Sequence, residues 1–65
     1  MRVIQTAEKA VTIWFVGETA PSLPAAMALV RGCLRHAGIA PWPKTEAECF
    51  TYGDETLLIA RPGKE

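Results

Sequence analysis

Few side chains in this sequence could bind a metal ion. His36 is the only histidine, and the two cysteines are Cys33 and Cys49. Cys33 and His36 would share one face of a helix, so Cys49 and a carboxylate such as Asp54 would have to complete a site. Structural zinc sites usually show two short paired spacings such as Cys-x-x-Cys, and a second pair is missing here. We expect no metal site, and we expect Cys33 to pack as a small apolar residue.

The remaining reactive residue types show no catalytic arrangement. Ser22 lacks the flanking glycines of a nucleophile elbow, and no glycine-rich phosphate loop occurs. His36 falls in the last turn of a predicted helix, where a cation favours the helix dipole. The carboxylates form no evident acid–base pair; they are Glu8, Glu18, Glu46, Glu48, Asp54, Glu55 and Glu65. We therefore expect no enzyme activity, no catalytic residue, no cofactor and no small-molecule ligand.

The placement of charge is more informative than its total. The chain has seven basic and seven acidic residues, so its net charge predicts no general attraction to nucleic acid or to acidic membranes. No acidic residue occurs between Glu18 and Glu46, however, and this stretch contains Arg31, Arg35 and Lys44. The outer face of the predicted helix is therefore basic, either to bind an anionic partner or simply to favour the helix dipole.

An aromatic residue lies beside this basic stretch. Trp42 is held between Pro41 and Pro43 in a segment that cannot be helical. Tryptophan is enriched at binding hot spots, but more often such a residue covers one end of the core. The candidate binding residues are Arg31, Arg35, Trp42 and Lys44.

One predicted helix and a few predicted strands must position these residues. Residues 22–37 predict one amphipathic helix, with Ser22 at its start and Gly38 as its stop. Residues 11–16 and 57–60 predict strands, and residues 2–6 predict a short edge strand. Residues 45–48 fit a helical capping box, whereas residues 50–61 fit a hairpin around Gly53 and Asp54. We favour a short helical turn followed by that hairpin.

The predicted fold is α+β, a two-layer sandwich formed by a single domain of residues 1–65. Its order is β-β-α-β-β, with a three- or four-stranded sheet covered on one face by the single long helix. The expected core is made of residues from the helical stripe and from two strands: Ile13, Phe15, Met27, Val30, Leu34, Leu57 and Ile59. The sequence does not determine which face of the sheet meets the helix.

Both predicted central strands are apolar on two faces, which is normal only for strands buried on both sides. A chain of 65 residues with 49% hydrophobic residues buries only about 60% of its unfolded surface, and such chains often gain stability by oligomerising. We therefore expect a homodimer or a protein partner at the uncovered sheet face or at an edge strand, with Trp14 or Leu58 near the centre.

The first functional hypothesis is a non-catalytic, cytoplasmic protein-interaction module that self-associates. The alternative is a small regulatory or nucleic-acid-binding protein that uses the basic helix face. No apolar run approaches the roughly 20 residues needed to span a bilayer, and two cysteines make no disulfide scaffold. Nucleic acid is a less favoured partner than protein, because the net charge is zero.

Overall fold

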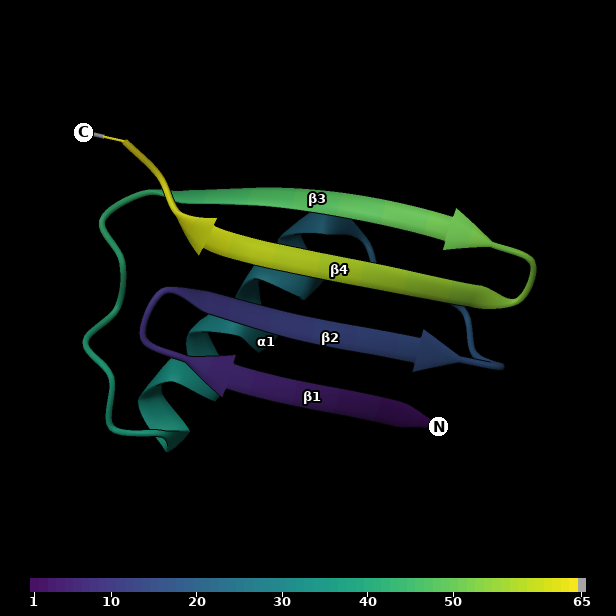
Figure 1. The fold of residues 1–65 in the computed structure, drawn as a ribbon, viewed down its shortest axis with the longest axis horizontal. Helices are drawn as coiled ribbons and strands as arrows, with labels where there is room; N and C mark the ends of the chain where they lie inside the picture. Colours follow the sequence, from purple (N-terminus) through teal and green to yellow (C-terminus); the bar gives the residue numbers. More distant parts are fainter. Residues whose placement is uncertain (65) are drawn as a thin grey trace.

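In a computed structural model, which describes residues 1–64, four strands and one helix account for most of the chain (Figure 1). The prediction of an α+β domain is confirmed, and the sheet has four strands in the spatial order β1-β2-β4-β3. All three neighbouring pairs are antiparallel. The elements are β1 (Arg2–Ala7), β2 (Ala10–Val16), α1 (Leu23–His36), β3 (Thr45–Tyr52) and β4 (Glu55–Pro62).

Two hairpins make up the sheet, and their turns differ. Gly53 connects β3 to β4 with a φ of 64°, while Asp54 keeps a negative φ. A glycine of positive φ at the first central position is typical of a type II′ turn, which matches the twist of the strands. The predicted hairpin at Gly53 and Asp54 is therefore confirmed. Glu8 and Lys9 connect β1 to β2 without any positive φ, so this turn is of a less favoured type.

The capping-box prediction for residues 45–48 is wrong. Those residues begin strand β3, which pairs with β4 along its whole length, from Thr45 opposite Pro62 to Tyr52 opposite Glu55. The local Thr-x-x-Glu pattern favours one helical turn. The hairpin instead gives every residue of this segment a partner on β4, and the tertiary pairing overrides the local preference.

The helix begins and ends close to the predicted residues. Ser22 occupies the N-cap position but its side chain donates or accepts no capping hydrogen bond. At the other end Gly38 has a φ of 75°. Its N–H donates to the carbonyl of Arg35 at 3.0 Å, and the N–H of Ile39 donates to the carbonyl of Leu34 at 2.8 Å. These two bonds satisfy carbonyls that the helix end would leave unpaired, and they need the left-handed glycine.

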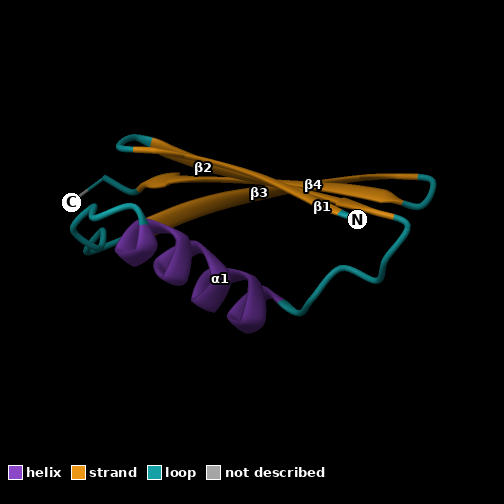
Figure 2. Cartoon of the chain, turned by 90° about the horizontal axis from the view of Figure 1, so that it is seen from below, coloured by secondary structure: helices purple, strands orange, loops and turns teal. Residues whose placement is uncertain are grey.

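The core lies between α1 and one face of the sheet (Figure 2). It contains the predicted Ile13, Phe15, Val30 and Leu34, all at most 1% exposed. Leu57 and Ile59 were expected there and are not in it, because β4 turns Leu58 and Ala60 toward the helix. Met27 is only partly buried at the margin of the core. The buried residues are Val11, Ile13, Phe15, Ala26, Val30, Leu34, Leu58 and Ala60.

Candidate functional site

Strand β1 is one free edge of the sheet, and its hydrogen-bonding pattern can be worked out from its first residue. Met1 and Val16 exchange two backbone bonds of 2.8 Å. Hydrogen-bonded and non-bonded pairs alternate along an antiparallel ladder. Counting from Met1, the odd residues of β1 therefore bond to β2. The N–H and C=O groups of Arg2, Ile4 and Thr6 point outward, where the sheet gives them no partner.

An open groove runs beside this edge, between β1 and α1. Its volume is about 730 Å³. Arg2, Ile4 and Thr6 form one wall, so the residues with outward backbone groups also turn their side chains into the groove. The helix forms the other wall with mostly small residues: Ala25, Ala28, Leu29, Gly32, Cys33 and His36. Ile4 is 44% exposed there, so this part of the apolar inner layer is left uncovered.

One end of the β1 edge is fixed by charge. The guanidinium of Arg2 donates to a carboxylate oxygen of Glu18 at 2.9 Å, and the amino group of Met1 lies 3.5 Å from the other oxygen. Arg2 also lies over the ring of Phe15, 5.3 Å from its centroid. The hydrogen bond from Arg2 is the main reason why the pKa of Glu18 lies below its ordinary value. These contacts order the start of β1.

The opposite edge, β3, is built differently. Glu46 and Glu48 both lie on it, and the guanidinium of Arg61 donates to Glu48 at 2.7 Å. Charged side chains on an edge strand discourage another strand from pairing there. Strand β1 carries only one charged residue, Arg2. The two edges therefore differ in how open they are to a new strand.

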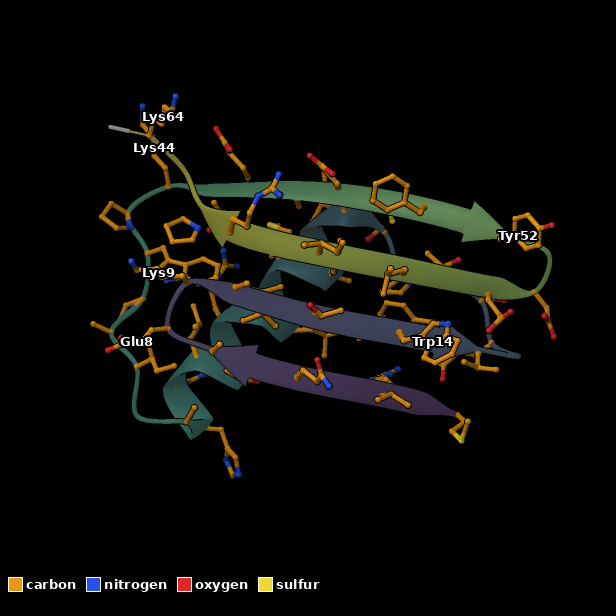
Figure 3. The ribbon with its side chains drawn as sticks, in the orientation of Figure 1. Glu8, Lys9, Trp14, Lys44, Tyr52 and Lys64 are labelled. Carbon is orange, nitrogen blue, oxygen red and sulfur yellow. The ribbon has the colours of Figure 1, made fainter. Side chains whose placement is uncertain are left out.

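The sheet face turned away from α1 is the second exposed surface. Strand pairing aligns Val3, Trp14, Leu57 and Phe50 in one row across all four strands. We call this set the apolar row. Trp14 is 43% exposed and Phe50 53% exposed. Figure 3 shows this face, with Trp14 and Tyr52 toward one end of the sheet and Lys9, Lys44 and Lys64 at the other.

Carboxylates flank the apolar row on both sides. Glu48 belongs to the next row toward Pro62, and Glu55 to the next row toward the Gly53 turn. Among the strand residues of this face, three are acidic (Glu46, Glu48 and Glu55) and one is basic (Arg61). Their formal charge is therefore −2.

The structure brings together only part of the predicted binding set. Arg31 and Arg35 are exposed and line one hollow of about 580 Å³ with Gly38, Ile39, Ala40 and Pro41. Lys44 is exposed but does not line that hollow. Within residues 1–64, neither arginine forms an ion pair with a carboxylate.

Trp42 has a structural contact beside the β1–β2 turn. Its side chain is half-buried and packs against the core, and its indole Nε1 donates to the carbonyl of Glu8 at 3.2 Å. The indole thus supports the β1–β2 turn, the turn whose backbone conformation is less favoured. Trp42 does not line the hollow that Arg31 and Arg35 share.

Of the two residues predicted for self-association, one lies on the uncovered face. Trp14 belongs to the apolar row. The assignment of Leu58 to that face is wrong, because Leu58 is 1% exposed and packs beneath α1. Leu57 takes its place opposite Trp14. Sequence reasoning also missed Val3, Ile4 and Phe50, although the alternation of each strand carries the signal.

The reactive side chains are dispersed. In the part of the chain that the structure describes, no three His, Cys, Asp or Glu residues gather as metal ligands. Cys33 is partly buried and Cys49 is exposed. Among the described residues, no helix is both long and apolar enough to cross a membrane.

Comparison with known proteins adds no family to this description. No family model matches the chain, and neither a curated protein nor a solved structure matches it. The surfaces that could bind a partner are the β1 edge with its groove, the apolar row, and the hollow lined by Arg31 and Arg35.

Proposed function

We propose that this protein is a non-catalytic interaction module that self-associates through the β1 edge. Each copy is a two-layer sandwich, with α1 covering one face of the sheet. A second copy adds its own β1 antiparallel to the first and extends the sheet across a two-fold axis. The observation that supports this most directly is the outward pattern of backbone groups at Arg2, Ile4 and Thr6.

The pattern is symmetric about Ile4. If Ile4 lies opposite Ile4 of the second copy, Arg2 lies opposite Thr6, and Thr6 opposite Arg2. Each of these three pairs can exchange two backbone hydrogen bonds, so every outward group finds a partner. No two like charges lie opposite each other, which avoids a known cause of instability in sheets. A two-fold axis at Val3 or Gln5 would pair fewer of the three residues, since it would join only Arg2 with Ile4, or only Ile4 with Thr6, within β1.

The groove beside the edge supports the same arrangement. Side chains of the added strand enter the groove, where the two Ile4 side chains meet and lose contact with water. Figure 1 shows that α1 crosses the sheet obliquely, and that its last turn extends past β1. Ala25, Ala28 and Gly32 line the helix wall, and such small residues allow a second helix to approach closely.

The total surface also favours a partner. The chain exposes 4628 Å², whereas the size scaling for a monomer of 7.1 kDa gives about 4,100 Å². An excess of about 500 Å² is large for so small a domain. Part of it is the uncovered inner face beside β1.

The test uses charge at the two-fold axis. Wild-type protein at tens of micromolar should have the solution mass of two chains by light scattering. Ile4→Lys places two ammonium groups opposite each other and should give the mass of one chain, and Ile4→Glu should do the same. Mixing the two variants should restore the dimer, because opposite charges then meet.

Gln5→Lys is the matched control, since it adds the same charge one residue along, opposite Val3 of the partner. It should remain a dimer. Circular dichroism shows whether each variant is folded. A monomeric wild type, or an Ile4→Lys protein that stays dimeric, would overturn the proposal.

A second candidate function rests on Arg31 and Arg35. They share one hollow, and no described carboxylate pairs with either of them. An anionic partner such as a nucleic-acid backbone would bind there. Binding of labelled single-stranded DNA should then weaken steeply between low and moderate salt and be lost in the Arg31→Glu, Arg35→Glu double variant. Equal retention of DNA by this variant would remove the candidate.

A further inference from the structure

We propose that the apolar row binds an amphipathic, positively charged helix of another protein. This surface lies on the face opposite α1 and does not include Arg2, Ile4 or Thr6, so the inference is independent of pairing at the β1 edge. The occupant is defined by three properties of the surface: its length, its flanking charges and its similarity to the opposite face.

The length of the row suits a helix. Val3, Trp14, Leu57 and Phe50 span four neighbouring strands, and three strand spacings measure about 14 Å. An apolar stripe on a helix repeats every three or four residues, so about ten residues cover the same length at 1.5 Å each. A helix lying along the row therefore contacts all four strands.

The exposed apolar area is sufficient to mark an interaction site. Trp14, Phe50 and Tyr52 are 43%, 53% and 86% exposed. Aromatic side chains bury roughly 150–250 Å² each, so these three leave roughly 300–450 Å² of surface open. Patches of this size on a small protein are often functional. Leu57, Ile59 and Val16 are partly exposed around them.

The charges beside the apolar row determine which charge the bound helix should carry. A helix that lies along the row places the residues beside its apolar stripe against Glu48 on one side and Glu55 on the other. Arg61 already pairs with Glu48, which leaves Glu55 available at the Trp14 end of the sheet. The lysines gather at the other end (Figure 3). Lys or Arg beside the stripe would be stabilised near Glu55, and Asp or Glu would be repelled.

The opposite face of the same sheet shows this mode of packing. There α1 presents Ala26, Val30 and Leu34 to the strands and buries them almost completely. An external helix on the apolar row would cover the second face in the same way. This mode, in which an amphipathic helix lays its apolar face on a hydrophobic surface, is common in peptide recognition.

The experiment uses two designed peptides as probes. One is a fluorescein-labelled helical 14-residue peptide with Leu on one face and Lys on the other, and the second has Glu at every Lys position. The Leu–Lys peptide should bind the wild-type protein in a fluorescence-anisotropy titration, and its affinity should fall as salt rises. The Leu–Glu peptide should bind at least about tenfold more weakly.

Variants locate the site. Phe50→Asp should weaken binding of the Leu–Lys peptide at least about tenfold, as expected for a central aromatic contact. Leu23→Asp is the matched control, because Leu23 is also an exposed apolar residue, 64% exposed, but begins α1 on the other side of the sheet. It should bind as wild type does. Glu55→Lys should reduce the preference for Lys over Glu in the peptide.

Equal binding of both peptides, or full binding by Phe50→Asp, would overturn the inference. A dimeric wild type whose Phe50→Asp variant has the solution mass of one chain would also overturn the inference. In that case a second copy of the chain would occupy the row. Ile4→Lys separates this result from the proposed function. It should bind the Leu–Lys peptide as wild type does, whether or not the wild-type chain is a dimer.

Discussion

The two faces of one sheet differ although the same strands build both. On the inner face, Ile13 and Leu58 are at most 1% exposed beneath α1. On the outer face, Trp14 is 43% exposed, and its neighbour Leu57 is only partly buried. Adjacent residues of similar hydrophobicity thus occupy very different environments. Hydrophobicity alone therefore does not identify the core, because the side chains that are buried are those that α1 covers.

The sharpest test of this difference compares Leu58→Ala with Leu57→Ala. Leu58→Ala leaves a cavity beneath α1 and should lower the free energy of unfolding by about 2–5 kcal/mol. Leu57→Ala removes a partly buried side chain of the outer face and should cost no more than about 1.5 kcal/mol. Urea unfolding of both variants measures the difference. Equal losses would mean that the outer face is as dry as the inner one.

The helix offers a second matched pair. Leu34 is 1% exposed against the sheet and Leu23 is 64% exposed. Leu34→Ala should cost about 2–5 kcal/mol, a large part of the stability of so small a domain, whereas Leu23→Ala should stay within about 0.5 kcal/mol. An unchanged urea midpoint for Leu34→Ala would show that this stripe does not face the core.

A polar substitution on the outer face should have a smaller effect. Phe50→Thr keeps a residue that favours strands and should change the stability of the Ile4→Lys monomer by about 0.5 kcal/mol or less. Thermal unfolding measures it. A loss above about 2 kcal/mol would show that the apolar row packs within the monomer and is not free to bind a partner.

The smallest expected effect is a change in the pH dependence of stability, caused by the ion pair between Arg2 and Glu18 at the start of β1. The pKa of Glu18 is lowered in the folded protein by the hydrogen bond from Arg2. Its contribution to stability is therefore present above the unfolded pKa, near 4.5, and is lost as the pH falls through the lower folded pKa. Glu18→Gln should flatten this part of a plot of stability against pH. If Glu18→Gln loses stability at acid pH as steeply as the wild type does, other carboxylates cause that loss.

The sequence predicted the elements better than their orientation. Residues 11–16 are rich in β-branched and aromatic side chains and residues 22–37 have a helical period, so both elements were predicted nearly to the residue. Residues 57–60 are apolar at every position, and nothing in their alternation chooses between Leu57 and Leu58. That choice follows from pairing with β2, where Leu58 lies opposite Ile13, a contact between residues far apart in the chain.

The candidate surfaces were harder to predict for the same reason. Trp14 was identified because, together with Val16, it makes the second face of its strand apolar as well. The apolar row needs the register of all four strands, including β3, whose first residues fit a helical turn equally well. The outward N–H and C=O groups of Ile4 follow from which residues of β1 bond to β2. The hydrogen-bonded pair of Met1 and Val16 shows that these are the odd-numbered residues.

The spatial order β1-β2-β4-β3 has a consequence for how the chain folds. Each outer strand pairs with its neighbour in sequence through a short turn, so both hairpins can form locally. The central pairing of β2 with β4 encloses everything from Gly17 to Asp54, and closing so long a loop has an entropic cost that must be met before its contacts form. We expect this closure to limit the folding rate. Variants in the Gly53 turn should slow folding less than variants at Ile13 and Leu58, where the two preformed hairpins dock.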